Sequence, residues 1–185
     1  MQRRHFLAAL VPVAAAPFVA RSDLARALLT PSDPMTPETA TSAGTQPVVR
    51  LDKPHEAWKP LLTEMQYAVL FEEHTERAGT SPLNREKRDG TFVCAACHLP
   101  LFTSETKFES GTGWPSFWAP IEGHVGTKRD FRLILPRTEY HCARCGGHQG
   151  HVFNDGPKPT GKRYCNNGVA LAFVPQGEAL PALRG

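Results

Sequence analysis

The sequence predicts a mainly β domain of antiparallel strands with a small helical part on its N-terminal side. Short runs of aliphatic, β-branched and aromatic residues follow one another, separated by Gly, Pro, Asn and Asp, and this pattern favours an antiparallel sheet. A helix signal stands before the first of these runs. The chain has 185 residues, 41% hydrophobic and 21% charged, which suits one globular core with residues left over at the ends.

Five segments carry the strand pattern. They are Thr91–Cys94, Phe131–Leu135, Tyr140–Cys142, His151–Phe153 and Tyr164–Val174. If the last is one continuous strand, its two-residue side-chain period places every second residue from Cys165 to Phe173 on one face. We therefore expect Cys165 and Asn167 to lie side by side.

The helical part is predicted just after Leu62. Thr63 and Gln66 have the spacing of a capping box, in which each side chain accepts a hydrogen bond from the other residue's backbone N–H. Apolar residues between positions 65 and 71 supply a buried side, and Gly79 follows. A short helix is therefore expected ahead of the sheet.

The N-terminal residues have the pattern of an export signal. Arg3 and Arg4 precede an apolar run from Phe6 to Ala20, which is too short to span a bilayer comfortably. The paired arginines are typical of a twin-arginine signal, which we place over residues 1–27 and which predicts an exported or periplasmic protein. The alternative is a leader in a cytoplasmic protein.

The rest of the chain divides into a linker, a domain and a tail. Residues 28–54 are rich in Ser, Thr, Pro and Ala and are expected to form a disordered linker, because they bury too little apolar surface to fold. The folded domain is expected over residues 55–175. Residues 176–185 are expected to form a frayed tail.

The charge balance argues against binding to polyanions. The formal net charge is +3, and cleavage near Ala20 would remove Arg3 and Arg4 but no acidic residue, which leaves +1. Such a balance provides little attraction for nucleic acid or an anionic membrane. We expect no nucleic-acid partner, and a monomer.

Four of the five cysteines form two CxxC pairs. Two residues between the cysteines of a pair let both sulfurs face one ion, and two pairs complete a four-thiolate shell with no open position for chemistry. The sequence therefore predicts one structural zinc ion, bound by Cys94, Cys97, Cys142 and Cys145. Two disulfides, or one redox-active dithiol, are the alternatives, although disulfides rarely close such tight loops.

The fifth cysteine, Cys165, is then the one thiol without a predicted partner. An unpaired cysteine is either reactive or buried and inert, and the local pattern leaves both open. His148 and His151 lie upstream, and strand alternation puts Phe153 on the same face as His151. A histidine near Cys165 can stabilise a thiolate or donate a proton, whereas the alternative makes His148 a surface residue and His151 a core residue.

A glycine-containing loop supplies candidate pocket residues. In the stretch SGTGWPSFW, Gly111 and Gly113 allow an unusual loop that presents Trp114 and Phe117 as the wall of a pocket for an apolar group. The alternative is that these aromatic side chains only pack in the core.

Taken together, three stretches resemble methionine sulfoxide reductase type B over about Leu62 to Val174. They read FVCAACHLPLFTSETKFESGTGWPSF, CARCGGHQGHVFNDGP and GKRYCNNGVALAF. The resemblance implies a β-tent-like antiparallel fold with a structural zinc, and reduction of the R epimer of methionine sulfoxide, free or in proteins. It implies Cys165 as nucleophile, with His151 and Asn167 beside it as catalytic residues. The substrate-binding residues expected on these grounds are Trp114, Phe117, His148 and Phe153.

The implied reaction leaves an oxidised cysteine that has to be reduced. Cys165 attacks the sulfoxide sulfur while His151 protonates the oxygen, and Cys165 becomes a sulfenic acid. Many members of the family carry a second cysteine just before the Gly-Trp-Pro, but here that position is Thr112. We therefore expect a thioredoxin-like or small-thiol reductant to act on Cys165 directly.

Two other classes of function compete with this interpretation. A zinc-ribbon interaction module with an inert Cys165 would explain the CxxC pairs but leave the other motifs without a reason to occur together. A cysteine hydrolase using Cys165 and His151 would form an acyl-enzyme, whereas a reductase forms a sulfenic acid.

Overall fold

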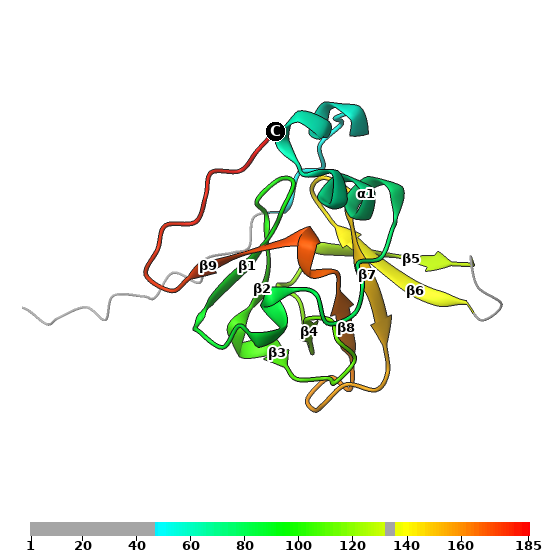
Figure 1. The fold of residues 1–185 in the computed structure, drawn as a ribbon, viewed down its shortest axis with the longest axis vertical. Coiled ribbons are helices and arrows are strands. Elements are labelled where there is room, and N and C mark those ends of the chain that lie inside the picture. The colour runs from blue at the N-terminus through cyan, green and yellow to red at the C-terminus, as the bar shows by residue number, and fades with distance from the viewer. Residues whose placement is uncertain (1–46, 132–135) are drawn as a thin grey trace, which may run out of the picture. The chain divides into compact units, whose positions relative to one another are not determined.

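The computed structural model describes residues 47–131 and 136–185 (Figure 1). The predicted export signal over residues 1–27 lies outside the described residues, as does the linker up to residue 46. The predicted strand Phe131–Leu135 also falls outside them except for Phe131, which belongs to no strand. Within the described ranges, we find no helix with the length and apolar character needed to cross a membrane.

Two antiparallel sheets form the described part of the chain. The three-stranded sheet has the order β2-β1-β9, with bounds Pro100–Thr103, Gly90–Cys94 and Leu171–Pro175. The six-stranded sheet has the order β3-β4-β8-β7-β6-β5, with bounds Lys107–Phe108, Ser116–Phe117, Arg163–Asn166, His148–Phe153, Arg137–Cys142 and Val125–Asp130. Every paired strand runs antiparallel to its neighbour. The prediction of a mainly β antiparallel domain is confirmed.

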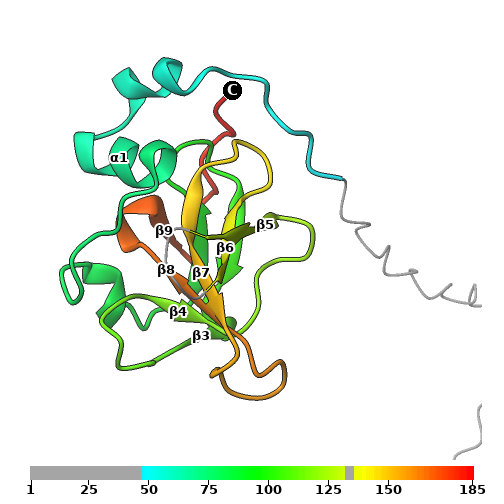
Figure 2. The ribbon, with the colours of Figure 1, turned by 90° about the vertical axis from the view of Figure 1, so that its right-hand side faces the viewer.

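The predicted helix is α1, Glu64–Glu72, and it begins as the capping box requires. Gln66 N donates to Thr63 Oγ1 at 3.2 Å, and Thr63 N donates to Gln66 Oε1 at 3.0 Å. The helix packs against β7 and the short helix η4, Gly168–Ala170 (Figure 2). The other short 3-10 helices are η1 His55–Leu61, η2 Pro82–Arg85 and η3 Ser104–Thr106.

The predicted strand Tyr164–Val174 is wrong, because the chain breaks into β8, η4 and β9. The strands β8 and β9 belong to different sheets, and Asn167 is the residue that caps η4 between them. The break occurs where Gly168 passes so close to Ser81 that an added Cβ would lie 1.9 Å from the Ser81 Oγ. The continuous side-chain alternation expected from Cys165 to Phe173 is therefore interrupted by η4 and resumes only in β9.

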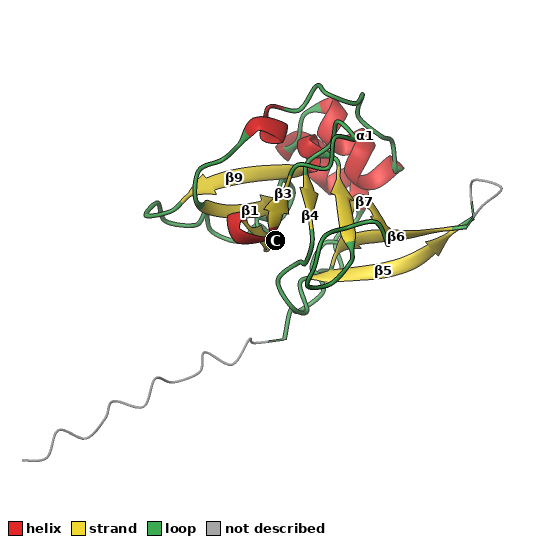
Figure 3. Cartoon of the chain, turned by 90° about the horizontal axis from the view of Figure 1, so that it is seen from below, coloured by secondary structure: helices red, strands yellow, loops and turns green. Residues whose placement is uncertain are grey.

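The helix α1 lies to one side of the strands (Figure 3). The core, which takes residues from both sheets, is aromatic. The Phe102 and Phe117 rings stack at 4.1 Å between centroids, and Phe92 meets Phe117 edge-on at 4.9 Å. Tyr140 is also fully buried, and its hydroxyl donates to Asn166 Oδ1 at 2.6 Å. Phe117 anchors β4 in this core, and β4 pairs with β8, where Ser116 is the register partner of Cys165.

Both ends of the described chain contact the cysteine loops. Leu51 N donates to Arg144 O at 2.7 Å, in the segment that the sequence assigns to the linker. In the tail, Arg184 N donates to Cys97 O at 3.1 Å, and the Arg144 guanidinium donates to Arg184 O. The tail expected to be frayed is therefore hydrogen-bonded to the domain.

Candidate active site and metal centre

A small cavity of about 120 Å³ opens beside Cys165. Its lining residues come from five parts of the chain and are Thr75, Trp114, Arg137, Gly150, His151, Phe153, Cys165, Asn166 and Asn167. Five of the residues predicted from the sequence are thus brought together, namely Cys165, His151, Asn167, Trp114 and Phe153. Gly113, with a φ of 91°, lets the loop turn so that Trp114 reaches the cavity.

Cys165 and His151 meet because β8 and β7 are paired with these two residues in register. His151 Nε2 lies 2.8 Å from Asp130 Oδ2, and the Arg137 guanidinium donates to the same carboxylate oxygen at 2.7 Å. Burial lowers the pKa of His151, and the nearby charge of Arg137 acts in the same direction, whereas Asp130 opposes both. Burial therefore favours the neutral form of the imidazole, and the contact with Asp130 orients the ring.

Cys165 is half-buried, and its burial raises the pKa of the thiol above the ordinary value of 9.0. The positive charge of Arg163 and a hydrogen bond from Thr112 oppose this shift; the Thr112 Oγ1 lies 4.0 Å from Cys165 Sγ. Arg163 is held in place by Asp155 through bonds of 2.9 and 2.8 Å. Arg163 and Thr112 are therefore groups that favour a thiolate at Cys165.

Asn167 and Trp114 line the cavity, and the polar groups of both side chains are hydrogen-bonded to backbone groups of the protein. Asn167 Nδ2 donates to Gln149 O at 3.1 Å, and its Oδ1 accepts from Glu76 N at 3.0 Å. Trp114 Nε1 donates to Glu76 O at 3.1 Å. Both side chains are thereby fixed in orientation before any substrate arrives.

Two predicted substrate-binding residues do not line the cavity. Phe117 is fully buried in the aromatic core, so its expected place in a pocket wall is a misprediction. His148 is also buried; its ring centroid lies 5.4 Å from that of His151, and its Nδ1 lies 3.0 Å from Glu139 Oε1. His148 thus contacts the ring of His151 but does not line the cavity.

The residues that orient the predicted site residues were not predicted from the sequence. Arg163 could have been found, because strand alternation puts it on the same face as Cys165. Asp130 and Arg137 are register partners across β5 and β6, but no spacing in the sequence connects them with His151. Glu76 carries no local signal at all.

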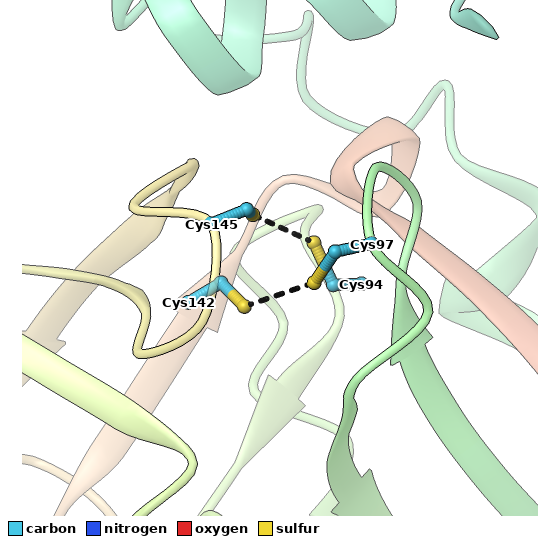
Figure 4. Close-up of side chains that lie close together, drawn as sticks. All are labelled: Cys94, Cys97, Cys142 and Cys145. Atoms are coloured by element: carbon cyan, nitrogen blue, oxygen red, sulfur yellow. Dashed lines mark hydrogen bonds between the residues drawn. The ribbon is translucent and has the colours of Figure 1, made fainter. Parts of the chain in front are cut away.

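The four paired cysteines form a second, closed cluster. Cys94 and Cys97 face Cys142 and Cys145 across a gap between two loops (Figure 4). The Cys94 and Cys145 sulfurs lie 3.7 Å apart, the Cys97 and Cys142 sulfurs 3.5 Å, and all four lie within 4.8 Å of one another. No disulfide joins them. A tetrahedral ion with bonds of about 2.3 Å needs sulfurs about 3.8 Å apart, so this buried set is fit to hold one metal ion.

Comparisons with known proteins agree with this arrangement. The SelR domain matches residues 62–175. A peptide methionine sulfoxide reductase MsrB of Leptospira interrogans is 51% identical over 124 residues, which cover 66% of this chain and 95% of that protein. The MsrB of Pseudomonas putida is 51% identical over 131 residues, covering 70% and 98%. The chloroplastic peptide methionine sulfoxide reductase B1 of Arabidopsis thaliana is 52% identical over 115 residues, covering 62% and 57%.

Proposed function

Because the chain belongs to the methionine sulfoxide reductase type B family, we propose that it reduces peptide-bound methionine R-sulfoxide with Cys165 as its nucleophile. The observation that carries this proposal is the position of Cys165. It is the one cysteine outside the four-cysteine cluster, and it lines a cavity directly opposite His151.

The cavity suits the end of a methionine side chain. Trp114 and Phe153 provide apolar surface for the methyl and methylene groups, while Asn167 and His151 provide polar groups near the thiol. Its volume of about 120 Å³ admits only a small group, so the rest of a peptide substrate stays outside. This arrangement supports Trp114 and Phe153 as substrate-binding residues.

The reaction follows from the groups that surround the thiol. Arg163 and the Thr112 hydroxyl stabilise the Cys165 thiolate, which attacks the sulfoxide sulfur. His151, oriented by Asp130, is the acid that protonates the oxygen as the sulfur–oxygen bond breaks. The attack forms a bond between the two sulfurs. Transfer of the protonated oxygen from the substrate sulfur to the Cys165 sulfur then breaks that bond, so Cys165 becomes a sulfenic acid and methionine leaves with its sulfur reduced.

Reduction of the sulfenic acid needs thiols from outside the chain. The side chain nearest the thiol on the loop before Gly-Trp-Pro is Thr112, which cannot form a disulfide. A first external thiol therefore condenses with the sulfenic acid to give a mixed disulfide and water, and a second thiol releases Cys165. Two thiols are oxidised for each sulfoxide reduced, and a thioredoxin-like dithiol or a small thiol supplies them.

We assign zinc to the four-cysteine cluster, because four thiolates at tetrahedral spacing are the ligands of a structural zinc site. A zinc ion bound there would have four thiolate ligands and no open coordination position for substrate. Cys94 ends β1 of the three-stranded sheet and Cys142 ends β6 of the six-stranded sheet. A bound ion would thus join the two sheets, and its binding energy would be part of the folding energy.

The proposed function is tested with a peptide carrying racemic methionine sulfoxide. The purified protein is incubated with this peptide and excess dithiothreitol, and the remaining epimers are separated by chiral chromatography. Selective loss of the R epimer supports the proposal, whereas persistence of both epimers refutes it. The same assay with a thioredoxin system in place of dithiothreitol tests the reductant class.

We also propose that the N-terminal residues direct export by the twin-arginine route. Arg3, Arg4 and the apolar run from Phe6 to Ala20 support this proposal, and a zinc site that is filled before export is compatible with a route for folded proteins. Cell fractionation of the full chain and of the variant with both arginines changed to lysine tests it. Equal cytoplasmic retention of both proteins would contradict export.

A further inference from the structure

Glu76 is a buried acidic residue next to the active site. It lies four residues after α1 and beside the cavity-lining Thr75, and only 4% of its surface is exposed. Buried carboxyl groups require hydrogen-bond partners, because the loss of water is otherwise uncompensated. The partners of Glu76 all belong to the site or to the turn that follows it.

The side chain of Glu76 holds the turn after Asn167. Its Oε1 accepts from Gly168 N at 2.6 Å, and its Oε2 accepts from Val169 N at 3.0 Å. Gly168 is required there, because an added Cβ would lie 3.2 Å from Glu76 Oε1 in addition to its clash with Ser81. The carboxyl group therefore binds the chain at the point where it leaves β8 and the cavity.

The backbone of Glu76 holds two side chains of the site. Its N–H donates to Asn167 Oδ1 at 3.0 Å, and its carbonyl accepts from Trp114 Nε1 at 3.1 Å. The first bond makes Oδ1 the accepting end of the Asn167 amide, so the NH₂ end is the donor. One residue thus joins the Asn167 amide, the Trp114 indole and the turn after the catalytic strand.

We propose that Glu76 is a positioning residue for the sulfoxide reduction assigned to this site, and the proposal rests on that proposed function. Its carboxyl group does not touch the substrate. It fixes the backbone of residue 76 against Gly168 and Val169, and that backbone in turn orients Asn167 and Trp114. Loosening the carboxyl contacts shifts both side chains together, and small displacements of positioning groups cost large factors in rate.

The test uses the isosteric variant Glu76→Gln. Its amide oxygen still accepts one backbone N–H, but its NH₂ group opposes the other. We expect kcat/KM for a peptide methionine R-sulfoxide to fall about tenfold or more. In ¹H–¹⁵N spectra, the Trp114 indole N–H and the Gly168 and Val169 amides should shift and exchange faster. The matched control is Glu86→Gln, because Glu86 Oε1 also accepts from two successive backbone N–H groups, at 3.0 and 2.9 Å, but lies outside the cavity lining.

The outcomes separate positioning from simple destabilisation. The proposal is overturned if Glu76→Gln keeps kcat/KM within about twofold of wild type, or if Glu86→Gln loses as much. It is also overturned if activity falls only in proportion to unfolded protein while the Trp114 indole signal is unchanged. If Glu76→Gln does not fold, Glu76→Asp takes its place, and wild-type kcat/KM in that variant overturns the proposal. An inactive wild-type chain would refute the proposed function, and the spectra would still test the positioning.

Discussion

Cys165 on β8 and His151 on β7 are direct partners in the register of the six-stranded sheet. Neighbouring antiparallel strands bring such partners close, so the thiol and the imidazole are held by the backbone ladder rather than by flexible loops. Asp130 then orients the imidazole from β5, and Arg163 and Thr112 act on the thiol. The groups that act on the thiol and on the imidazole are thus different residues, so each role can be tested by its own substitution.

Replacing Cys165 with serine should abolish sulfoxide reduction and leave the fold intact. The serine hydroxyl is a weak nucleophile toward the sulfoxide sulfur, while the four-cysteine cluster is untouched. Zinc content and the thermal unfolding temperature should match those of wild type. Any residual turnover above the blank would remove Cys165 from the mechanism.

The pH dependence of kcat/KM should separate the acid from the nucleophile. Burial lowers the pKa of His151 and raises that of Cys165. Between these two pKa values, the imidazolium fraction falls with rising pH by the same factor by which the thiolate fraction grows. A reaction that needs both forms therefore has a kcat/KM that does not change with pH in this range. In His151→Asn the acid requirement disappears, and kcat/KM should rise about tenfold per pH unit through the neutral range, from a level about 100-fold lower. A flat profile in His151→Asn would assign the acid role to another group.

Because the pKa of His151 is lowered in the folded chain, the free energy of unfolding should decrease as the pH falls. The unfolded chain binds a proton at a pKa of about 6.5 while the folded chain stays neutral, so this contribution is present above that pH and is lost as the pH falls through it. Chemical denaturation at several pH values measures the effect. The loss between neutral and mildly acidic pH should be smaller in His151→Asn than in wild type; an equal loss would contradict the assignment.

Removing one ligand of the four-cysteine cluster should reduce stability before it affects the chemistry. In Cys97→Ser, zinc content per chain should fall well below one, and the free energy of unfolding should fall by several kcal/mol, because metal binding is coupled to folding. Zinc analysis and denaturant titration measure the two quantities, with Cys165→Ser as the control. Unchanged zinc stoichiometry would refute the four-cysteine site.

Placing a cysteine at position 112 should create an intramolecular disulfide during turnover. The Thr112 Oγ1 lies 4.0 Å from Cys165 Sγ, so a sulfur in its place reaches the sulfenic acid. After one turnover without reductant, Thr112→Cys should lose two hydrogens by mass, whereas wild type gains one oxygen. Ser110→Cys is the control, because Ser110 contacts Thr112 but not Cys165. Identical products from the two variants would contradict direct attack across this contact.

Replacing Phe117 should affect stability, whereas replacing Phe153 should affect KM. Phe117 lies in the core, so Phe117→Ala should cost about 3–5 kcal/mol of unfolding free energy and leave the KM of the folded fraction unchanged. Phe153 lines the cavity, so Phe153→Ala should raise KM with a smaller effect on stability. A raised KM in Phe117→Ala would restore the pocket role expected from the sequence.

The features that depend on short spacings could be predicted from the sequence alone. Turns, helix caps and metal-binding knuckles are local structures, so a few neighbouring residues are enough to indicate them. This holds for the capping box at Thr63, the two CxxC pairs, the unpaired Cys165 and the Trp114 loop. The antiparallel β class followed in the same way from the alternation of apolar runs and turns.

Which side chains serve the site depends on contacts between distant parts of the chain. The break at Gly168 depends on the close approach of Ser81, and the bonds of Glu76 to Gly168 and Asn167 join residues about ninety positions apart. Phe117 lies in β4 and Trp114 in the loop just before it, yet one packs in the core and the other lines the cavity. Contacts of this kind depend on which strands become neighbours, and a periodicity along one segment carries no information about its partner.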